Sequence, residues 1–157
     1  MKYLVRLYDW GALISFSAMM TCILIEVLFR NLLQMPTTWA EEASRLFFIW
    51  SVFLGSASAW FRGAHIIILV LVSRLIGRVK LSFKIAVDVL TAVFLISIWV
   101  GTIFIMQISY HQKTTALEIS ISYFYLALFL GLTGMIIFHV NDMIRTIRKF
   151  GAPTEGT

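Results

Sequence analysis

Long apolar runs separated by short islands of charge constrain this sequence more than any other feature. Three such runs stand out, at 10–33, 85–108 and 119–140. A helix needs about 20 mostly apolar residues to cross the hydrocarbon core of a bilayer. Of the whole chain, 60% is hydrophobic and only 13% is charged, against about 25% charged in soluble domains. The sequence therefore excludes a water-soluble globule and predicts an all-α membrane protein.

A fourth predicted span lies at 38–61, although only residues 46–61 of it are apolar. The apolar part alone is too short to cross a bilayer, so the helix must begin near Thr38. Thr38 and Glu41 have the spacing of a capping box, which favours a helix start there. The wet end of this helix then carries three charged residues, Glu41, Glu42 and Arg45.

The apolar segment at 66–76 is roughly half as long as a span and is followed at once by several cations. We expect a short interfacial helix there, between the second and third spans, because carrying those cations into lipid would be costly. The four transmembrane helices form one domain at 1–150. A polar tail at 151–157 with Gly and Pro is expected to be flexible.

Positive charge is distributed unequally between the two sides that four spans would define. The N-terminal tail, the segment between the second and third spans and the C-terminal tail hold ten Lys and Arg residues, whereas the other loops and their helix ends hold three. Since cytoplasmic loops carry the excess of Lys and Arg, both termini are expected in the cytoplasm. A signal peptide is disfavoured because the first run is too long and ends in charged residues without a small-x-small cleavage site.

Charged residues near the outer ends of the first two helices are expected to neutralise each other. Glu26 and Arg30 are four residues apart, which places them on one helix face. Glu41 and Arg45 have the same spacing, in the favourable order of acid before base. If the first two helices are antiparallel neighbours, Glu42 is then left for Arg30.

This reasoning predicts an outer polar cluster without net charge, which holds the helices together or contacts a partner subunit. Its charged members are Glu26, Arg30, Glu42 and Arg45. Trp39 marks the outer interface beside them. At the inner side, Asp88 and Asp142 are expected to be solvated members of helix-end charge pairs.

Small residues at a regular spacing predict where helices approach closely in lipid. Ser51, Gly55 and Ala59 recur every four residues on the second helix. A similar row on the first helix consists of Gly11, Ser15, Ala18 and Cys22. Gly131 and Gly134 on the fourth helix give a weaker signal, because their gap is three residues.

No pattern in the sequence indicates catalysis, a metal site or a cofactor. The single cysteine, Cys22, excludes a disulfide framework. His111 belongs to an outer loop while His65 and His139 lie near the inner surface, so no pair can ligate a haem at mid-depth. Phosphate-binding glycine loops and nucleophile elbows are missing from the sequence. We expect neither enzyme activity nor a nucleic-acid partner, and we interpret the net charge of +5 as topology.

The second helix and its flanks resemble a known family. The string RNLLQMPTTWAEEASRLFFIWSVFLGSASAWFRGAH, residues 30–65, with a hydropathy profile that covers nearly the whole chain, resembles the small membrane subunit of the tripartite ATP-independent periplasmic (TRAP) transporters, the DctQ-like family. The matching positions are Arg30, Trp39, Glu41, Glu42, Arg45, Phe48, Trp50, Phe53, Gly55, Arg62 and His65. Asn31 and Leu69 depart from the family pattern, in which an aromatic residue and an aspartate are common.

The resemblance implies import of an organic acid across a bacterial inner membrane. In that family a soluble periplasmic protein captures the substrate, and a large membrane subunit carries it with sodium as the coupling ion. The small subunit binds the large one tightly, holds neither substrate nor sodium, and offers part of the docking surface for the periplasmic protein. By the same resemblance, Arg62 and His65 form an inner-loop motif.

A different class of protein is the main alternative. Small four-helix exporters that exchange protons for drugs also carry a glutamate in their first helix, which would be Glu26 here. Such an acid must be unpaired, whereas Arg30 lies one turn away. A haem-binding membrane anchor of a redox enzyme is less favoured still, because histidines are missing at mid-depth.

Overall fold

The computed structural model describes residues 2–34, 37–62 and 78–151 of the chain. Within these residues the regular structure is helical, apart from an isolated bridge between Lys113 and Ser120. The four long helices are α1 (Lys2–Leu28), α2 (Thr38–Phe61), α4 (Arg78–Ile108) and α5 (Ser122–Gly151). A π-helical turn, η1 (Phe29–Leu33), extends α1, and a 3-10 turn, η2 (Ser109–His111), extends α4.

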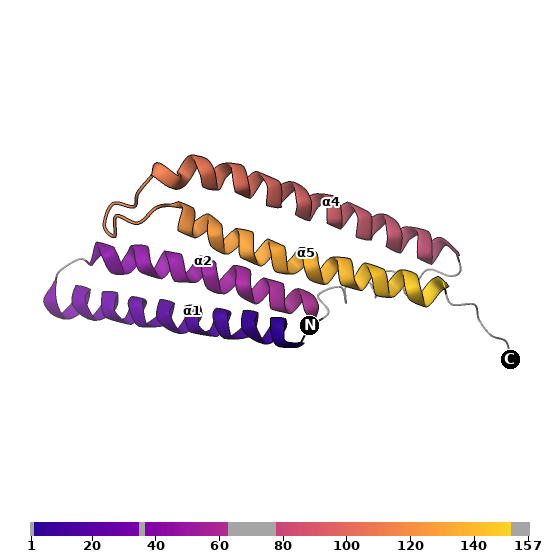
Figure 1. Cartoon of the computed structure of the whole chain (residues 1–157). Helices are drawn as coiled ribbons and strands as arrows, with labels where there is room; N and C mark the ends of the chain where they lie inside the picture. Colours follow the sequence, from indigo (N-terminus) through magenta and orange to yellow (C-terminus); the bar gives the residue numbers. More distant parts are fainter. Residues whose placement is uncertain (1, 35–36, 63–77, 152–157) are drawn as a thin grey trace.

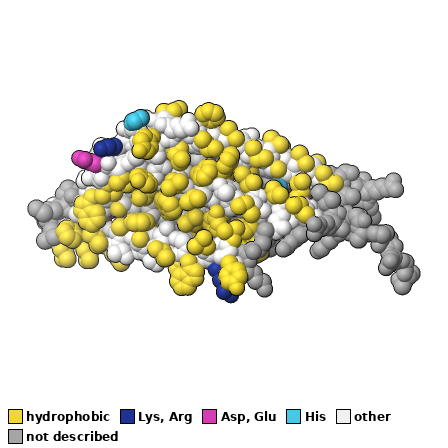
Figure 2. Space-filling view, in the orientation of Figure 1, with side chains coloured by type: hydrophobic (Ala, Val, Ile, Leu, Met, Phe, Trp, Pro, Cys, Tyr) yellow, Lys and Arg dark blue, Asp and Glu magenta, His cyan; other side chains and the backbone are white. Residues whose placement is uncertain are grey.

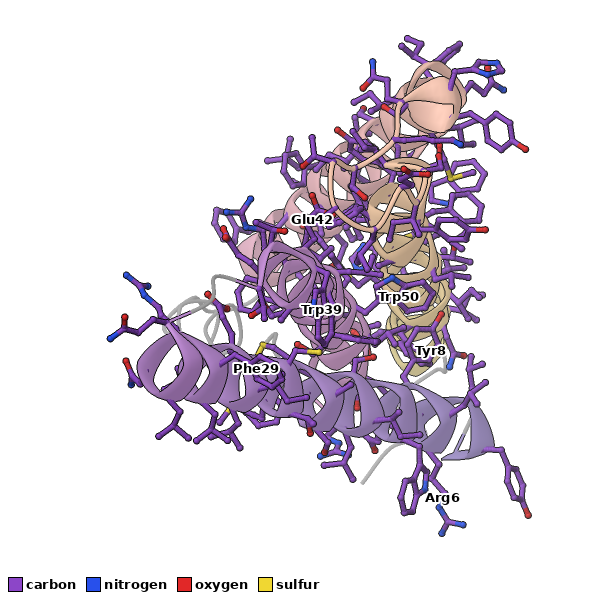
Figure 3. The ribbon with its side chains drawn as sticks, turned by 90° about the vertical axis from the view of Figure 1, so that its left-hand side faces the viewer. Arg6, Tyr8, Phe29, Trp39, Glu42 and Trp50 are labelled. Carbon is purple, nitrogen blue, oxygen red and sulfur yellow. The ribbon has the colours of Figure 1, made fainter. Side chains whose placement is uncertain are left out.

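The long helices lie side by side and alternate in direction along the chain (Figure 1). Their order across the molecule is α1, α2, α5, α4, so α2 and α5 occupy the middle. We call the end where α2 begins and the α4–α5 loop (residues 112–121) lies the loop end. The opposite end, where α1 begins and α5 ends, is the terminal end. Figure 3 shows α1 crossing the others obliquely, with Tyr8 beside α5.

Three of the described helical segments are long and apolar enough to cross a membrane: Tyr3–Leu32, Phe83–His111 and Ser122–Ile144. The prediction of an all-helical chain is confirmed for the described residues, and three helices have the length and hydropathy that a span needs. With 24 residues, α2 is about 36 Å long, but its charged first turns and its serines make it less apolar. A span by α2 and the cytoplasmic location of the termini stay predictions.

The helix starts differ from those expected from hydropathy, except for α2, which coincides with the expected 38–61. The helices predicted at 10–33 and 85–108 begin earlier, at Lys2 and Arg78. Hydropathy detects the length that lipid can cover, whereas a helix continues into water for as long as its backbone hydrogen bonds do. The extra turns at these two starts carry charged residues, which lower their hydropathy in the sequence, although the apolar segment of α1 begins as early as Tyr3.

The helix predicted at 119–140 is displaced at both ends, since α5 begins at Ser122 and continues to Gly151. Ile119 and Ile121 belong instead to a hairpin. The Thr114 N–H donates to the Ile119 carbonyl at 2.9 Å, and the Ile121 N–H donates to the Gln112 carbonyl at 2.9 Å. The two isoleucines are apolar, so hydropathy assigned them to the helix, although their backbone is hydrogen-bonded within the hairpin.

The start of α2 corrects a second expectation. Thr37, not Thr38, is the N-cap residue, and its side chain makes no capping hydrogen bond. Glu41 bonds the Arg45 guanidinium instead of returning to the helix start, so the capping box does not form. The interfacial helix expected at 66–76, His65 and the tail after Gly151 lie outside the described residues.

Two glycines of α5 lie in close contact with α1 and α2. A Cβ atom on Gly131 would lie 2.8 Å from both the Cβ and the carbonyl oxygen of Phe53 on α2. On Gly134 it would lie 2.7 Å from the Tyr8 ring of α1 and 3.1 Å from Ala57 of α2. The Tyr8 hydroxyl then donates to the Leu130 carbonyl at 2.9 Å. Backbones can approach this closely only where no side chain intervenes.

The row of small residues predicted on α2 has a smaller part in this packing. Gly55 faces α1, because a Cβ there would lie 3.8 Å from the Cβ of Ala12. Ser51 bonds its own helix at the Phe48 carbonyl, and Ala59 is exposed. A Cβ atom would thus clash at Gly131 and Gly134 of α5 but not at Gly55 of α2, although the α2 row has the more regular spacing in the sequence.

Candidate functional site

A single carboxylate ties α2 to the α4–α5 loop. Oε1 of Glu42 accepts hydrogen bonds from the Thr115 N–H at 3.0 Å, the Thr115 hydroxyl at 2.7 Å and the Ala116 N–H at 3.0 Å. Oε2 accepts from the Leu117 N–H at 2.9 Å and shares the Ala116 N–H at 3.1 Å. Figure 3 shows Glu42 on the side of α2 next to this loop. We call this contact the Glu42 anchor.

The loop is folded so that three successive N–H groups converge on the Glu42 anchor. The hairpin is closed by the Lys113–Ser120 bridge, and it turns at Glu118, whose φ of 53° is left-handed. The Ser120 hydroxyl fixes the base of the loop by donating to the Tyr110 carbonyl at 2.9 Å. Successive backbone N–H groups in such a turn form a concave anion site.

The anchor strongly favours the ionised form of Glu42. Hydrogen bonds from the Thr115 hydroxyl and from the Leu117 and Ala116 N–H groups lower the pKa of this carboxyl from 4.5 to about 2. Glu42 lies ahead of the apolar part of α2, at the loop end. The Thr115 hydroxyl and the backbone N–H groups thus do for this carboxylate what a cationic side chain was expected to do.

The polar cluster predicted at the loop end is not assembled. Arg45 pairs with Glu41, and Arg62 pairs with Asp9. The Glu41–Arg45 pair is as expected, whereas neither Glu26 nor Glu42 pairs with Arg30. Arg30 lies in the π-helical turn, whose wider winding alters the angular spacing from Glu26. Trp39 is exposed, at the same end (Figure 3).

A second carboxylate, which the sequence analysis missed, acts at the terminal end. Asp9 of α1 accepts hydrogen bonds from the Ser58 hydroxyl and from the Arg62 guanidinium, both of α2. Antiparallel packing brings the early part of α1 beside the end of α2. The expected antiparallel arrangement of the first two helices could therefore have predicted this pairing. Arg62, predicted as part of an inner-loop motif, is therefore an interhelical partner of Asp9.

Buried polar groups also join the parts of α2, α4 and α5 nearest the terminal end. Asp88 is only 6% exposed, which corrects the expectation of a solvated side chain. The buried His139 ring on α5 places Nε2 2.9 Å from the Asp88 carbonyl oxygen. Trp60 of α2 contacts the same ring edge to face. The helices enclose Asp88 because α5 packs directly along this part of α4.

An open hollow of about 900 Å³ lies at the loop end, between η2 and the start of α5. Its rim carries charged and aromatic side chains, Tyr110, His111, Lys113, Glu118 and Tyr123. Met106, Ile119 and Leu126 give it an apolar component. Figure 2 shows hydrophobic side chains over much of one face, with basic, acidic and histidine side chains near the loop end. The hollow thus combines apolar contact area with charges of both signs.

The chain matches the family model of the DctQ component of the tripartite ATP-independent periplasmic transporters over residues 19–149. The match includes α2, α4, nearly all of α5 and the second part of α1. It therefore contains the Glu42 anchor and the whole α4–α5 loop. No curated protein matches the chain.

Proposed function

Since the chain belongs to the DctQ component family of the tripartite ATP-independent periplasmic transporters, we propose that it supports a large membrane subunit in uptake of an organic acid across the bacterial inner membrane. A soluble periplasmic binding protein delivers the substrate. The large subunit carries it together with sodium, so this chain needs neither a substrate site nor an ion site. The family match over 19–149 is the observation that carries this proposal.

The packing of the helices supports a scaffolding role. The central helices are fixed to each other by glycine contacts and to their neighbours by the Asp9 and Glu42 carboxylates. The outer helices expose large apolar side chains, among them Phe16 and Leu24 on α1 and Leu90 and Phe104 on α4. Such faces suit lipid or the helices of a second membrane subunit. A stiff unit with apolar flanks can widen the fixed part of a transporter.

We also propose that α2 is a fourth span and that both termini are cytoplasmic. The position of α2 between α1 and α5 favours a path through the same depth of membrane, and the distribution of cations favours a cytoplasmic terminal end. The loop end is then periplasmic. Single cysteines at Ser82 and Gln112, in a Cys22→Ser background, test this with an impermeant thiol reagent added outside cells. Labelling at 112 without labelling at 82 is expected, and the reverse pattern would overturn the topology.

Co-expression with a candidate large subunit tests the function itself. The two chains are expected to co-purify, and vesicles that contain both should accumulate the organic acid when the binding protein and an inward sodium gradient are supplied. Vesicles that contain the large subunit alone are the control. Equal uptake by the large subunit without this chain would contradict the supporting role.

The exporter alternative makes a different prediction for Glu26. In the structure Glu26 has no ion pair with Arg30, so the charge argument against an exporter loses its geometric basis. The family match nevertheless favours the transporter subunit. Proton-coupled drug export by this chain alone, abolished by Glu26→Gln, would favour the exporter instead.

A further inference from the structure

We propose that Glu42 is a positioning residue for docking, because it holds the α4–α5 loop as a preformed surface that the soluble binding protein contacts. This inference rests on the proposed function, which supplies the periplasmic partner and the orientation of the loop end. It adds which surface makes the contact and which residue sets the shape of that surface.

Two groups of residues in the loop make different contacts. The tip of the hairpin, residues 115–117, is tied to α2 by the Glu42 anchor. Lys113 and Glu118 flank this tip and line the hollow. Because these residues belong to one short hairpin, fixing the tip also fixes where Lys113 and Glu118 present their charges.

The chemistry of the rim fits a water-soluble protein partner. Tyr110 and Tyr123 are 66% and 53% exposed, although both line the hollow. Exposed aromatic residues beside an open hollow are typical anchors of protein interfaces. Lys113 and Glu118 add one charge of each sign, so a partner with complementary charges is steered into a defined orientation.

Rigidity explains why an anchor would matter for docking. The hairpin bonds, the Ser120 hydroxyl bonds and the Glu42 anchor together engage the backbone on both sides of the turn. A surface that is already ordered pays less conformational entropy when a partner binds. Loss of the anchor therefore weakens docking without removing any residue that touches the partner.

Glu41 provides a matched control for Glu42. The two residues are adjacent and chemically identical, but Glu41 pairs with Arg45 of its own helix, and both of those side chains are at least half exposed. The hydrogen bond of Glu41 goes to Arg45 and not to the α4–α5 loop. Glu41→Gln and Glu42→Gln thus remove the same charge from the same turn of α2 and differ in their effect on the loop.

The test uses the complex of this chain with the large subunit in lipid vesicles, and titrates in the purified binding protein. For Glu42→Gln we expect docking to weaken about tenfold, as loss of preorganisation predicts, and the amides of 115–117 to exchange hydrogen faster. Glu41→Gln should change neither measurement. Lys113→Ala should weaken docking but leave amide exchange unchanged, because it alters the surface and not the anchor.

Several results would overturn the inference. Faster exchange with normal docking in Glu42→Gln would show that the loop is not the docking surface, and unchanged exchange would show that Glu42 does not hold it. Loss of co-purification with the large subunit would place Glu42 at the subunit contact instead. If Glu42→Gln fails to accumulate, Thr115→Val decides, since it removes only the hydroxyl bond of 2.7 Å and should show both changes in weaker form. A wild-type chain that does not bind the large subunit would contradict the proposed function, which is a separate outcome.

Discussion

The two ends of this molecule are each held by one carboxylate, but the partners of the two carboxylates differ. At the terminal end, Asp9 bonds a guanidinium and a hydroxyl of α2. At the loop end, Glu42 bonds three backbone N–H groups and one hydroxyl. A side-chain cation brings a full charge that salt can screen, whereas backbone dipoles are built into the fold and vary little with side-chain identity.

The largest expected effect comes from breaking the packing on which both ends depend. Gly131→Ala places a Cβ 2.8 Å from the Phe53 backbone, and α5 must then move away from α2. We expect overpacking to cost about 1–3 kcal/mol, measured as a lower melting temperature in detergent. Gly101→Ala on α4 is the control, because a Cβ there meets nothing within 4 Å. Equal destabilisation by both variants would contradict this account of the packing.

The next effect concerns the terminal end alone. Asp9→Ala removes the partner of both Ser58 and Arg62, so it should destabilise more than Arg62→Ala. The Arg62 and Asp9 side chains are 63% and 36% exposed, and solvent screening limits the pair to about 1 kcal/mol or less. A double-mutant cycle at low and high salt measures the coupling, which should shrink in high salt. A coupling that salt leaves unchanged would mean that the pair does not behave as a solvated ion pair.

A smaller effect is expected for the exposed pair next to the anchor. Glu41→Gln removes a contact between neighbours on one helix face, which is worth about 0.3–0.5 kcal/mol. The melting temperature should therefore hardly change. A loss as large as that of Asp9→Ala would show that Glu41 holds more than Arg45.

The smallest effect is expected on acidification from pH 7 to pH 5. The pKa of Glu42 is lowered to about 2, so its contribution is complete above the ordinary value of 4.5 and is lost only as the pH falls from there towards 2. Protection of the 115–117 amides, corrected for the intrinsic exchange rate, should be equal at the two pH values. Release of the loop by pH 5 would show that the carboxylate is not held as described.

The sequence predicted where the helices lie along the chain better than it predicted which side chains contact each other between them. The α2 bounds and the Glu41–Arg45 pair follow from length and spacing along one helix, which are local properties. The sequence analysis paired Glu42 with Arg30 because an acidic side chain is expected to lie near a basic one. Every residue except proline has a backbone N–H group, so the sequence does not indicate which of these groups bind a carboxylate. Only the fold of the α4–α5 loop brings those groups together, so the anchor could not be predicted without it.

The same limit applies to Asp9 and Asp88. Each lies close to basic residues in the sequence and near the edge of an apolar run, which favoured a solvated helix end for Asp88 and drew no attention to Asp9. The antiparallel contact with α2 and the packing of α5 on α4 determine their surroundings. For glycines, the room for a Cβ atom depends on which helix faces them: it is lacking at Gly131 and Gly134, whereas a Cβ atom at Gly55 would make an ordinary contact.

The order of the helices across the molecule has a consequence for how the chain is made. Synthesis produces α4 before α5, yet α5 lies between α2 and α4 and contacts both. Trp50 of α2 donates to the Tyr123 carbonyl, and Trp99 of α4 donates to the Thr133 hydroxyl. These contacts of α2 and α4 can form only after α5 has been synthesised. A chain that ends after α4 therefore lacks the helix that joins α2 to α4, and the addition of α5 completes the bundle.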